Sequence, residues 1–121
     1  MAAYSDNDIP ILPIKATSQA TSRPGWKYLL RPEQPLPLVA SSGGAYATDL
    51  ITVKGRPVGF MLHDRPVDPG DTGWRFFAGP EFAQWEYKPG TGAFFVLNVI
   101  ANYDPSIISF LQQPVGCAFW R

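Results

Sequence analysis

The chain has 121 residues, and its ten Lys plus Arg balance ten Asp plus Glu, so the formal net charge is zero. This length is enough for one domain with a single core, and a hydrophobic content of 45% excludes an intrinsically disordered chain. The balanced charge argues against a nucleic-acid-binding protein that relies on a basic face. The single cysteine, Cys117, excludes both an intramolecular disulfide and a multi-thiolate metal site.

The N-terminal residues indicate a cytoplasmic protein. Residues 1–8 have no basic start and no apolar core, unlike a secretory signal. The longest apolar stretch, residues 93–101, is far shorter than the about 20 residues that a membrane-spanning helix needs. We therefore expect no membrane association.

Prolines are concentrated in the first 40 residues, where they disfavour long helices. We predict a Pro-rich extended arm over residues 1–37, which wraps one α+β domain over residues 38–121. The apolar run at residues 26–30 is expected to dock this arm on the domain.

Two strands joined by a tight hairpin are predicted next. Residues 50–53 and 58–62 are apolar and rich in β-branched and bulky side chains, and Lys54-Gly55 lies between them. A further strand, expected to be half-buried, is predicted at residues 74–78. The continuous apolar run at residues 94–100 predicts a strand in the centre of the sheet.

One helix is predicted over about residues 105–112. Asp104 can accept hydrogen bonds from the first-turn N–H groups, Pro105 fits the first helical position, and Pro114 ends the helix. Residues 115–120 return as a short last strand. The predicted fold class is α+β, with a mainly antiparallel sheet of about five strands and this one principal helix.

No catalytic, cofactor-binding or metal-binding residue is predicted. His63, the only histidine, has no G-x-S-x-G nucleophile to act with and is interpreted as a surface residue at a strand end. The carboxylates of Asp64, Asp68 and Asp71 lack the alternate-residue spacing and final Glu of a calcium loop. On one exposed loop they could instead serve as an electrostatic docking surface for a protein.

A second candidate docking patch lies in the polar stretch at residues 84–88. Trp85, Glu86 and Tyr87 combine aromatic rings with a carboxylate, and Trp and Tyr dominate the energetics of protein interfaces. Partner-binding residues are therefore predicted in both places.

Three polar residues in apolar surroundings call for partners. Arg75 lies in an aromatic strand, so we predict that it pairs with a carboxylate, either Asp104 or Asp71. Asn98 and Asn102 are expected to satisfy backbone groups at a strand-to-helix corner.

Three blocks of the sequence resemble a known family. The stretch Gly73-Trp74-Arg75-Phe76-Phe77-Ala78-Gly79, the stretch at residues 98–108 and the closing residues 114–121 are similar, in this order, to its signatures. The family is bacterial immunity protein family thirty-three, formerly a domain of unknown function. The resemblance covers about residues 39–121.

The resemblance implies a non-enzymatic protein that binds a cognate bacterial toxin in the cytoplasm and blocks it. It brings no catalytic residues. The family motif positions matched here are Gly73, Trp74, Arg75, Phe76, Phe77, Asn98, Asn102, Tyr103, Asp104 and Pro105. The chain departs from the family pattern in a less acidic loop before Gly73, in Trp120, and in the arm at residues 1–37.

Two alternatives to a toxin-binding protein stay open. One is a self-associating structural domain, a homo-oligomer in which the arm swaps onto a neighbour. The other is a small-molecule-binding protein or enzyme with a cleft between helix and sheet, lined by Arg75, Asn98, Tyr103 and Asp104.

Overall fold

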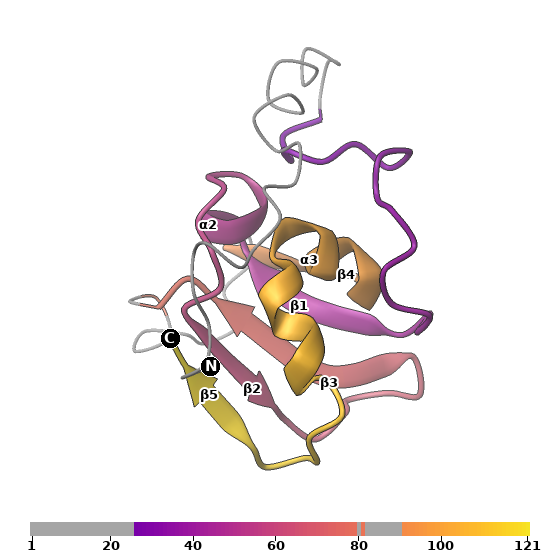
Figure 1. The fold of residues 1–121 in the computed structure, drawn as a ribbon, viewed down its shortest axis with the longest axis vertical. Helices are drawn as coiled ribbons and strands as arrows, with labels where there is room; N and C mark the ends of the chain where they lie inside the picture. The colour runs from indigo at the N-terminus through magenta and orange to yellow at the C-terminus, as the bar shows by residue number, and fades with distance from the viewer. Residues whose placement is uncertain (1–25, 80, 82–90) are drawn as a thin grey trace.

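The computed structural model describes residues 26–79, 81 and 91–121. Within them the chain forms one five-stranded sheet in the order β4-β1-β3-β2-β5, with β4 and β5 at its two edges (Figure 1). The strands are β1 (Gly44–Thr48), β2 (Phe60–His63), β3 (Asp71–Phe77), β4 (Gly92–Val96) and β5 (Ala118–Trp120).

The sheet is mixed but mostly antiparallel. β1 pairs with β4, β2 with β3, and β2 with β5 in antiparallel fashion, whereas β1 and β3 run parallel. The predicted α+β class and the predicted number of strands are confirmed.

Three short helices cover one face of the sheet: α2 (Asp49–Thr52), α3 (Leu97–Tyr103) and the 3₁₀ helix η3 (Pro105–Phe110) (Figure 1). The main core lies between this helical layer and the sheet, where burial of apolar side chains supplies most of the stabilisation. Its fully buried members include Ala47, Met61 and Phe76 from the strands and Ile100 and Ile107 from the helices.

The opposite face of the sheet carries a smaller aromatic cluster. Tyr46, Phe60 and Phe77 are buried there, and Leu62 packs against them. The period-2 alternation of strand side chains places Trp74 and Phe76 toward the helices, and Arg75 and Phe77 toward this second face.

The predicted hairpin at residues 50–62 is wrong in its first half. Residues 50–52 belong to helix α2, and the Val53 N–H donates to the Asp49 carbonyl at 2.8 Å. Gly55, at φ 78°, ends the helix, and its N–H donates to the Ile51 carbonyl at 3.0 Å. A short apolar run does not distinguish a buried helix from a strand. The second strand is confirmed as β2, with shifted bounds.

The prediction of one central strand over residues 94–100 is also wrong. β4 ends at Val96, α3 begins at Leu97, and β4 is an edge strand. The end of β4 and the start of α3 both bury some of their apolar side chains. The apolar run therefore continues to residue 100, although the backbone changes from strand to helix within it. The central strand is β3, whose residues are almost all buried rather than half-buried.

The helix predicted over residues 105–112 is present as η3, which is shorter and of 3₁₀ type. Its start is confirmed: Pro105 lies in the first turn, and the Asp104 carboxylate accepts from the Ser106 N–H at 3.1 Å. Helix α3, which directly follows β4, was not predicted. The last strand is confirmed as the shorter β5.

The described part of the arm docks on the domain, as predicted for residues 26–30. Leu30 is buried in the main core, and the Leu29 N–H donates to the Thr52 carbonyl at 2.9 Å. Tyr103, at the end of α3, accepts from the Leu30 N–H and donates to the Thr52 carbonyl, both at 2.9 Å. Burial raises the pKa of Tyr103 to about 12. Residues 1–25 lie outside the described residues, and the division at residue 37 stays a prediction.

We predict that Tyr103→Phe lowers the free energy of unfolding by about 1–3 kcal/mol, because it leaves the buried Leu30 N–H without an acceptor. Urea denaturation followed by tryptophan fluorescence measures this change. Tyr28→Phe is the control, since the ring contacts of Tyr28 with Trp26 and Phe95 survive it. Equal stability of the two variants would contradict the anchoring role of the Tyr103 hydroxyl.

Candidate functional site

The centre of the sheet holds a buried ion pair between Arg75 and Asp71. Two guanidinium nitrogens of Arg75 donate to the two carboxylate oxygens of Asp71, at 2.8 and 2.6 Å. Arg75 is fully buried, and its guanidinium also lies over the ring of Phe94, 5.4 Å from the centroid. The predicted pairing is confirmed with Asp71 and is wrong for Asp104.

Asp71 also organises the loop that precedes β3. Its carboxylate accepts from the Val67 N–H and the Gly73 N–H, both at 2.9 Å. The hydrogen bonds from Arg75 outweigh the cost of burial and hold the pKa of Asp71 well below its usual range. Asp71 is therefore a structural carboxylate that ties residues 67–75 together.

Gly73 lets the chain bend inside this arrangement. Its φ is 91°, and a Cβ there would overlap the carbonyl oxygen of Asp64. The Asp64 N–H donates to the Gly73 carbonyl at 2.7 Å, which closes the base of the loop at residues 64–70.

The three loop acids do not share one exposed surface. Asp68 is exposed, Asp64 is partly exposed, and Asp71 is buried against Arg75. The expectation of an exposed Asp71 is wrong, because its carboxylate satisfies buried donors. Residues 65–70 of this loop are all exposed; among them are Arg65, Asp68 and Val67, which is 66% exposed.

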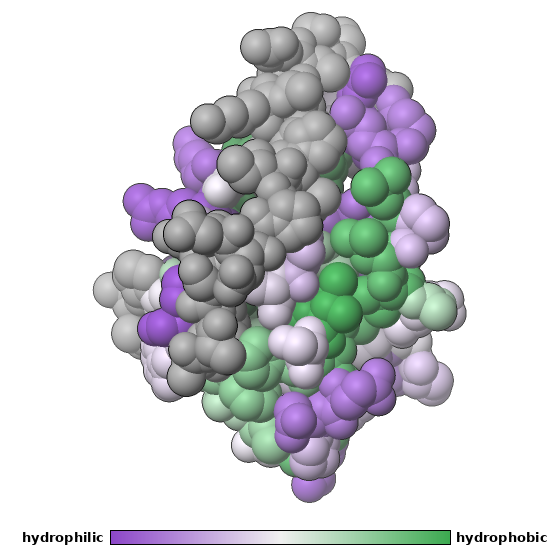
Figure 2. Space-filling model, viewed as in Figure 1, coloured by the Kyte–Doolittle hydropathy of each residue, from purple (hydrophilic) through white to green (hydrophobic). Residues whose placement is uncertain are grey.

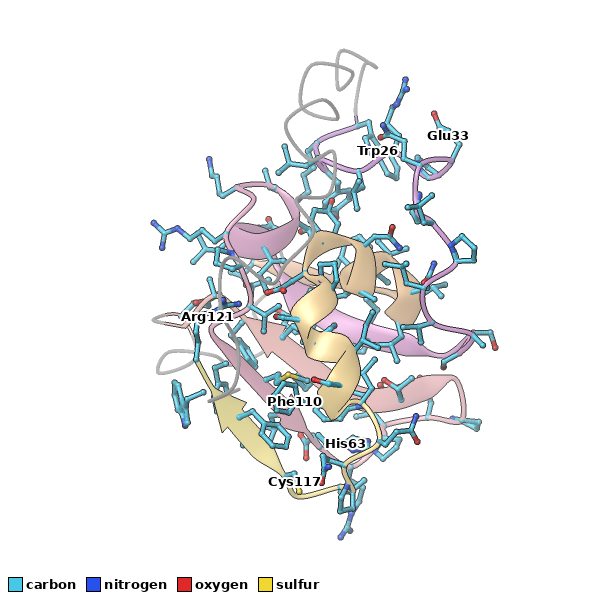
Figure 3. All side chains as sticks on the ribbon, in the orientation of Figure 1. Trp26, Glu33, His63, Phe110, Cys117 and Arg121 are labelled. Carbon is cyan, nitrogen blue, oxygen red and sulfur yellow. The ribbon has the colours of Figure 1, made fainter. Side chains whose placement is uncertain are left out.

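His63 lies at the end of β2, as expected, and is half-buried (Figure 3). Its ring stacks on Trp74 at 4.3 Å, and its two nitrogens contact the carbonyl oxygens of Gln113 and Thr72 at 2.7 and 2.9 Å. His63 thus joins the end of β2 to the start of β3 and to the turn after η3. It touches no serine, cysteine or carboxylate side chain in the contacts of the described residues.

Two asparagines of α3 bind the backbone of residues 36–39, where the predicted arm meets the domain. Asn98 accepts from the Leu38 and Val39 N–H groups at 2.9 and 2.8 Å, and Asn102 accepts from the Leu36 N–H at 2.8 Å. Both amides also donate to the Leu36 carbonyl at 2.8 Å. The prediction that they satisfy backbone groups is confirmed, although most of those groups belong to residues 36–39 rather than to the corner.

Asp104 closes the domain at its C-terminal end. Its buried carboxylate accepts from the Val58 N–H at 2.9 Å and from Arg121 at 2.8 Å (Figure 3). Arg121 also donates to the Val58 carbonyl, through two nitrogens. The sequence analysis missed this pair, and no local pattern links residues 104 and 121.

The motif residues therefore do not line a shared pocket. Arg75 faces one side of the sheet, Asn98 faces the arm, and Tyr103 and Asp104 bind backbone groups at different places. The predicted small-molecule cleft of these four residues is not formed.

A groove is present elsewhere, between residues 38–41 and the helical layer. It has a volume of about 430 Å³ and a mainly apolar lining. Figure 2 shows an apolar band on the face that carries these elements. The lining residues are Leu38, Val39, Ala40, Ser41, Thr72, Leu97, Ile108, Leu111 and Gln112. The sequence signal that could have found the groove is the apolar run Leu38-Val39-Ala40, all of which line it.

Other sequence predictions lie outside what the structure covers. Trp85, Glu86 and Tyr87 fall outside the described residues, so their partner-binding role stays a prediction. Among the described residues, no group of His, Cys, Asp and Glu could hold a metal ion. No helix there is long and apolar enough to cross a membrane.

We predict that Asp71→Asn lowers the free energy of unfolding by about 3–5 kcal/mol at pH 7, because Arg75 stays buried without its counter-charge. Urea denaturation across pH measures the difference from the wild type. The pKa of Asp71 is lower in the folded chain than its unfolded value of about 3.9. Its contribution is thus fully present above pH ~4 and is lost as the pH falls further, so the difference shrinks in acid.

Asp68→Asn is the matched control for this prediction. Asp68 is exposed, and in the described contacts its carboxylate accepts only from the nearby Gly70 N–H, an acceptor that an amide oxygen can replace. We expect a change within about 0.5 kcal/mol at every pH. If the stability difference between the wild type and the Asp71→Asn variant did not vary with pH, the assigned role of the carboxylate would be contradicted.

Comparison with known proteins identifies the family of this domain. Residues 45–121 match the family model of the immunity protein Imm33 domain. A search of curated proteins found no match, and neither did a search of solved structures. The match covers more than half of the chain and contains almost all of the sheet, the Asp71–Arg75 pair and Asp104. The chain belongs to the Imm33 family of immunity protein domains.

Proposed function

We propose that this chain is a cytoplasmic immunity protein that binds a protein toxin and neutralises it without catalysing a reaction. The observation that carries the proposal is the family match over residues 45–121. Neutralisation by binding requires a stable surface complementary to the toxin, and it requires no catalytic groups. A toxin-binding site is therefore expected among the exposed residues.

The loop at residues 64–70 is the first contact surface that we propose. Asp71 and Gly73 fix its base through buried hydrogen bonds, so little conformational entropy is lost when a partner binds. Val67 presents an apolar side chain, 66% exposed, between the charged residues Arg65 and Asp68. An apolar contact with a polar rim is the usual anatomy of a protein interface.

The groove supports the same function from a neighbouring position. Thr72 lines its wall and directly follows Asp71, so the groove begins where the loop ends. Its lining contains no charged residue, and its volume would accommodate apolar side chains of a partner. A toxin surface that offers an apolar anchor to the groove and charged groups to Arg65 and Asp68 would match both features.

The test begins with a tagged chain in an extract of its own bacterium and identification of the bound protein by mass spectrometry. The captured protein is then expressed alone and together with the immunity chain in a heterologous host, with growth as the readout. We predict that the captured protein arrests growth and that the wild-type chain restores it. A captured protein that is harmless, or that arrests growth equally with and without the chain, would overturn the proposed function.

The loop is tested with a pair of matched variants. We predict that Val67→Asp weakens toxin binding about tenfold or more, since truncating or charging a central interface residue costs more than about 1 kcal/mol. Val115→Asp is the control, because Val115 is also an exposed valine, at 50%, but lies outside the loop. Calorimetry measures both affinities. Equal affinities would remove the loop from the interface.

A further inference from the structure

β4 forms an open edge of the sheet (Figure 1). One side of β4 pairs with β1 over its whole length, from Gly44 opposite Val96 to Thr48 opposite Gly92. The strand order places no other strand of the described residues on its outer side.

The hydrogen-bond alternation of β4 follows from its flanking contacts. The Leu97 N–H donates to the Gly43 carbonyl and the Asp49 N–H donates to the Thr91 carbonyl, both at 2.9 Å. In an antiparallel pair every second residue bonds to the partner strand, so Ala93 and Phe95 also face β1. The N–H and C=O groups of Gly92, Phe94 and Val96 consequently point away from the sheet.

Within the described residues, this edge strand carries none of the sequence features that usually protect an edge against pairing. Folded proteins blunt exposed edges with charged side chains, proline or bulges. The residues from Gly92 to Val96 include no charge and no proline, and their register with β1 is regular. Phe94 and Val96 keep 50% and 47% of their side chains exposed beside this edge.

β5, the other edge strand, is also uncharged, but it is shorter and its end is bound to the domain. It has three residues and is followed directly by Arg121, whose side chain is bound to Asp104 and Val58. The Arg121 N–H donates to the Gly59 carbonyl at 2.8 Å, which holds the end of β5 against β2. Of these two edge strands, β4 is the longer one and therefore offers more backbone groups for strand addition.

We propose that β4 pairs with β4 of a second copy of this chain, antiparallel and centred on Phe94, to form a dimer with one continuous sheet. A two-fold axis through Phe94 places Phe94 opposite its own copy and Gly92 opposite Val96. The outward N–H and C=O groups of these three residues then bond to each other across the axis. The exposed Val96 side chain lies over the glycine of the other copy, where no side chain competes for the space.

Two observations favour a second copy as the occupant of the edge. The strand is self-complementary in length and in residue size about Phe94, which a symmetric interface requires. It also lacks charge, so two copies meet without repulsion, and the aromatic pair at the axis adds favourable cross-strand contact.

The test uses the fact that residue 94 would face itself. Phe94→Glu and Phe94→Lys each place like charges opposite each other at the axis, whereas a mixture of the two variants places opposite charges there. We expect each variant alone to self-associate about tenfold or more weakly than the wild type, and the equimolar mixture to recover a dimer of one copy of each. Sedimentation equilibrium from micromolar to millimolar protein measures the association, and native mass spectrometry identifies the mixed dimer.

Val115→Lys is the control, because it adds a charge at an exposed apolar residue shortly before β5, the opposite edge of the sheet from β4, and we expect it to dimerise like the wild type. Hydrogen exchange gives a second readout: the amides of Gly92, Phe94 and Val96 should become protected as the concentration rises. A wild-type chain that stays monomeric at millimolar concentration would overturn the proposal. So would a dimer that both charged variants leave intact, and so would a monomer in which a different protein protects the β4 amides.

Discussion

The ion pair between Asp71 and Arg75 fixes the strand on which the rest of the domain is assembled. Arg75 is fully buried at the centre of β3, so its charge has to be neutralised within the protein. Asp71 does this from the start of the same strand and uses both oxygens. Because that carboxylate also accepts from the Val67 and Gly73 N–H groups, one buried charge sets the loop, the bend and the first residues of β3 together.

Elsewhere in the domain, individual polar side chains bind the irregular segments to the helices and strands. Tyr103 binds backbone groups of the arm and of α2, and Asn98 and Asn102 bind the backbone of residues 36–39. Asp104 joins the segment before β2 to η3 and to the last residue. A small domain with three- to seven-residue elements leaves many backbone groups outside helices and strands. These side chains satisfy them where regular structure cannot.

The sequence predicted the chemistry of individual residues better than the boundaries of the elements. The partner of Arg75, the cap at Asp104 and the backbone contacts of Asn98 and Asn102 follow from local rules about buried charge and capping. The strand at residues 74–78 was found because its aromatic residues favour the pleated geometry. These predictions depended on few residues and short distances along the chain.

The errors have a common physical cause. The apolar runs at residues 50–53 and 94–100 would be buried as strand or as helix, and only their contacts in the folded chain decide between the two. The helical conformation of α2 places Ile51 in the core. Helix α3 begins directly after Val96, the last residue of β4 that pairs with β1. The contact of Arg121 with Asp104 also brings together residues that are distant in the sequence. The same is true of the groove between residues 38–41 and η3, so neither could be predicted from a local pattern.

The exposure of Asp71 was misjudged for a related reason. The sequence shows three acids on one polar loop, but only the position of Arg75 beneath the loop turns one of them inward. The same contact changes what can serve as a docking surface: Arg65, Val67 and Asp68 remain outside.

The residues of the family motif therefore stabilise the fold. Recognition of a partner must depend on exposed residues. Trp74 and Phe76 fill the core, Arg75 and Gly73 shape β3, and Asp104 closes the C-terminal end. Residues that are buried and saturated with internal hydrogen bonds cannot also select a partner. Among the described residues, the features that differ from a plain polar surface include the tip of the loop at Val67, the groove beside Leu38, and the uncharged edge at Phe94. Because the motif residues make internal contacts, the fold can be kept while these outward residues change. Specificity for the proposed toxin would then depend on the outward residues.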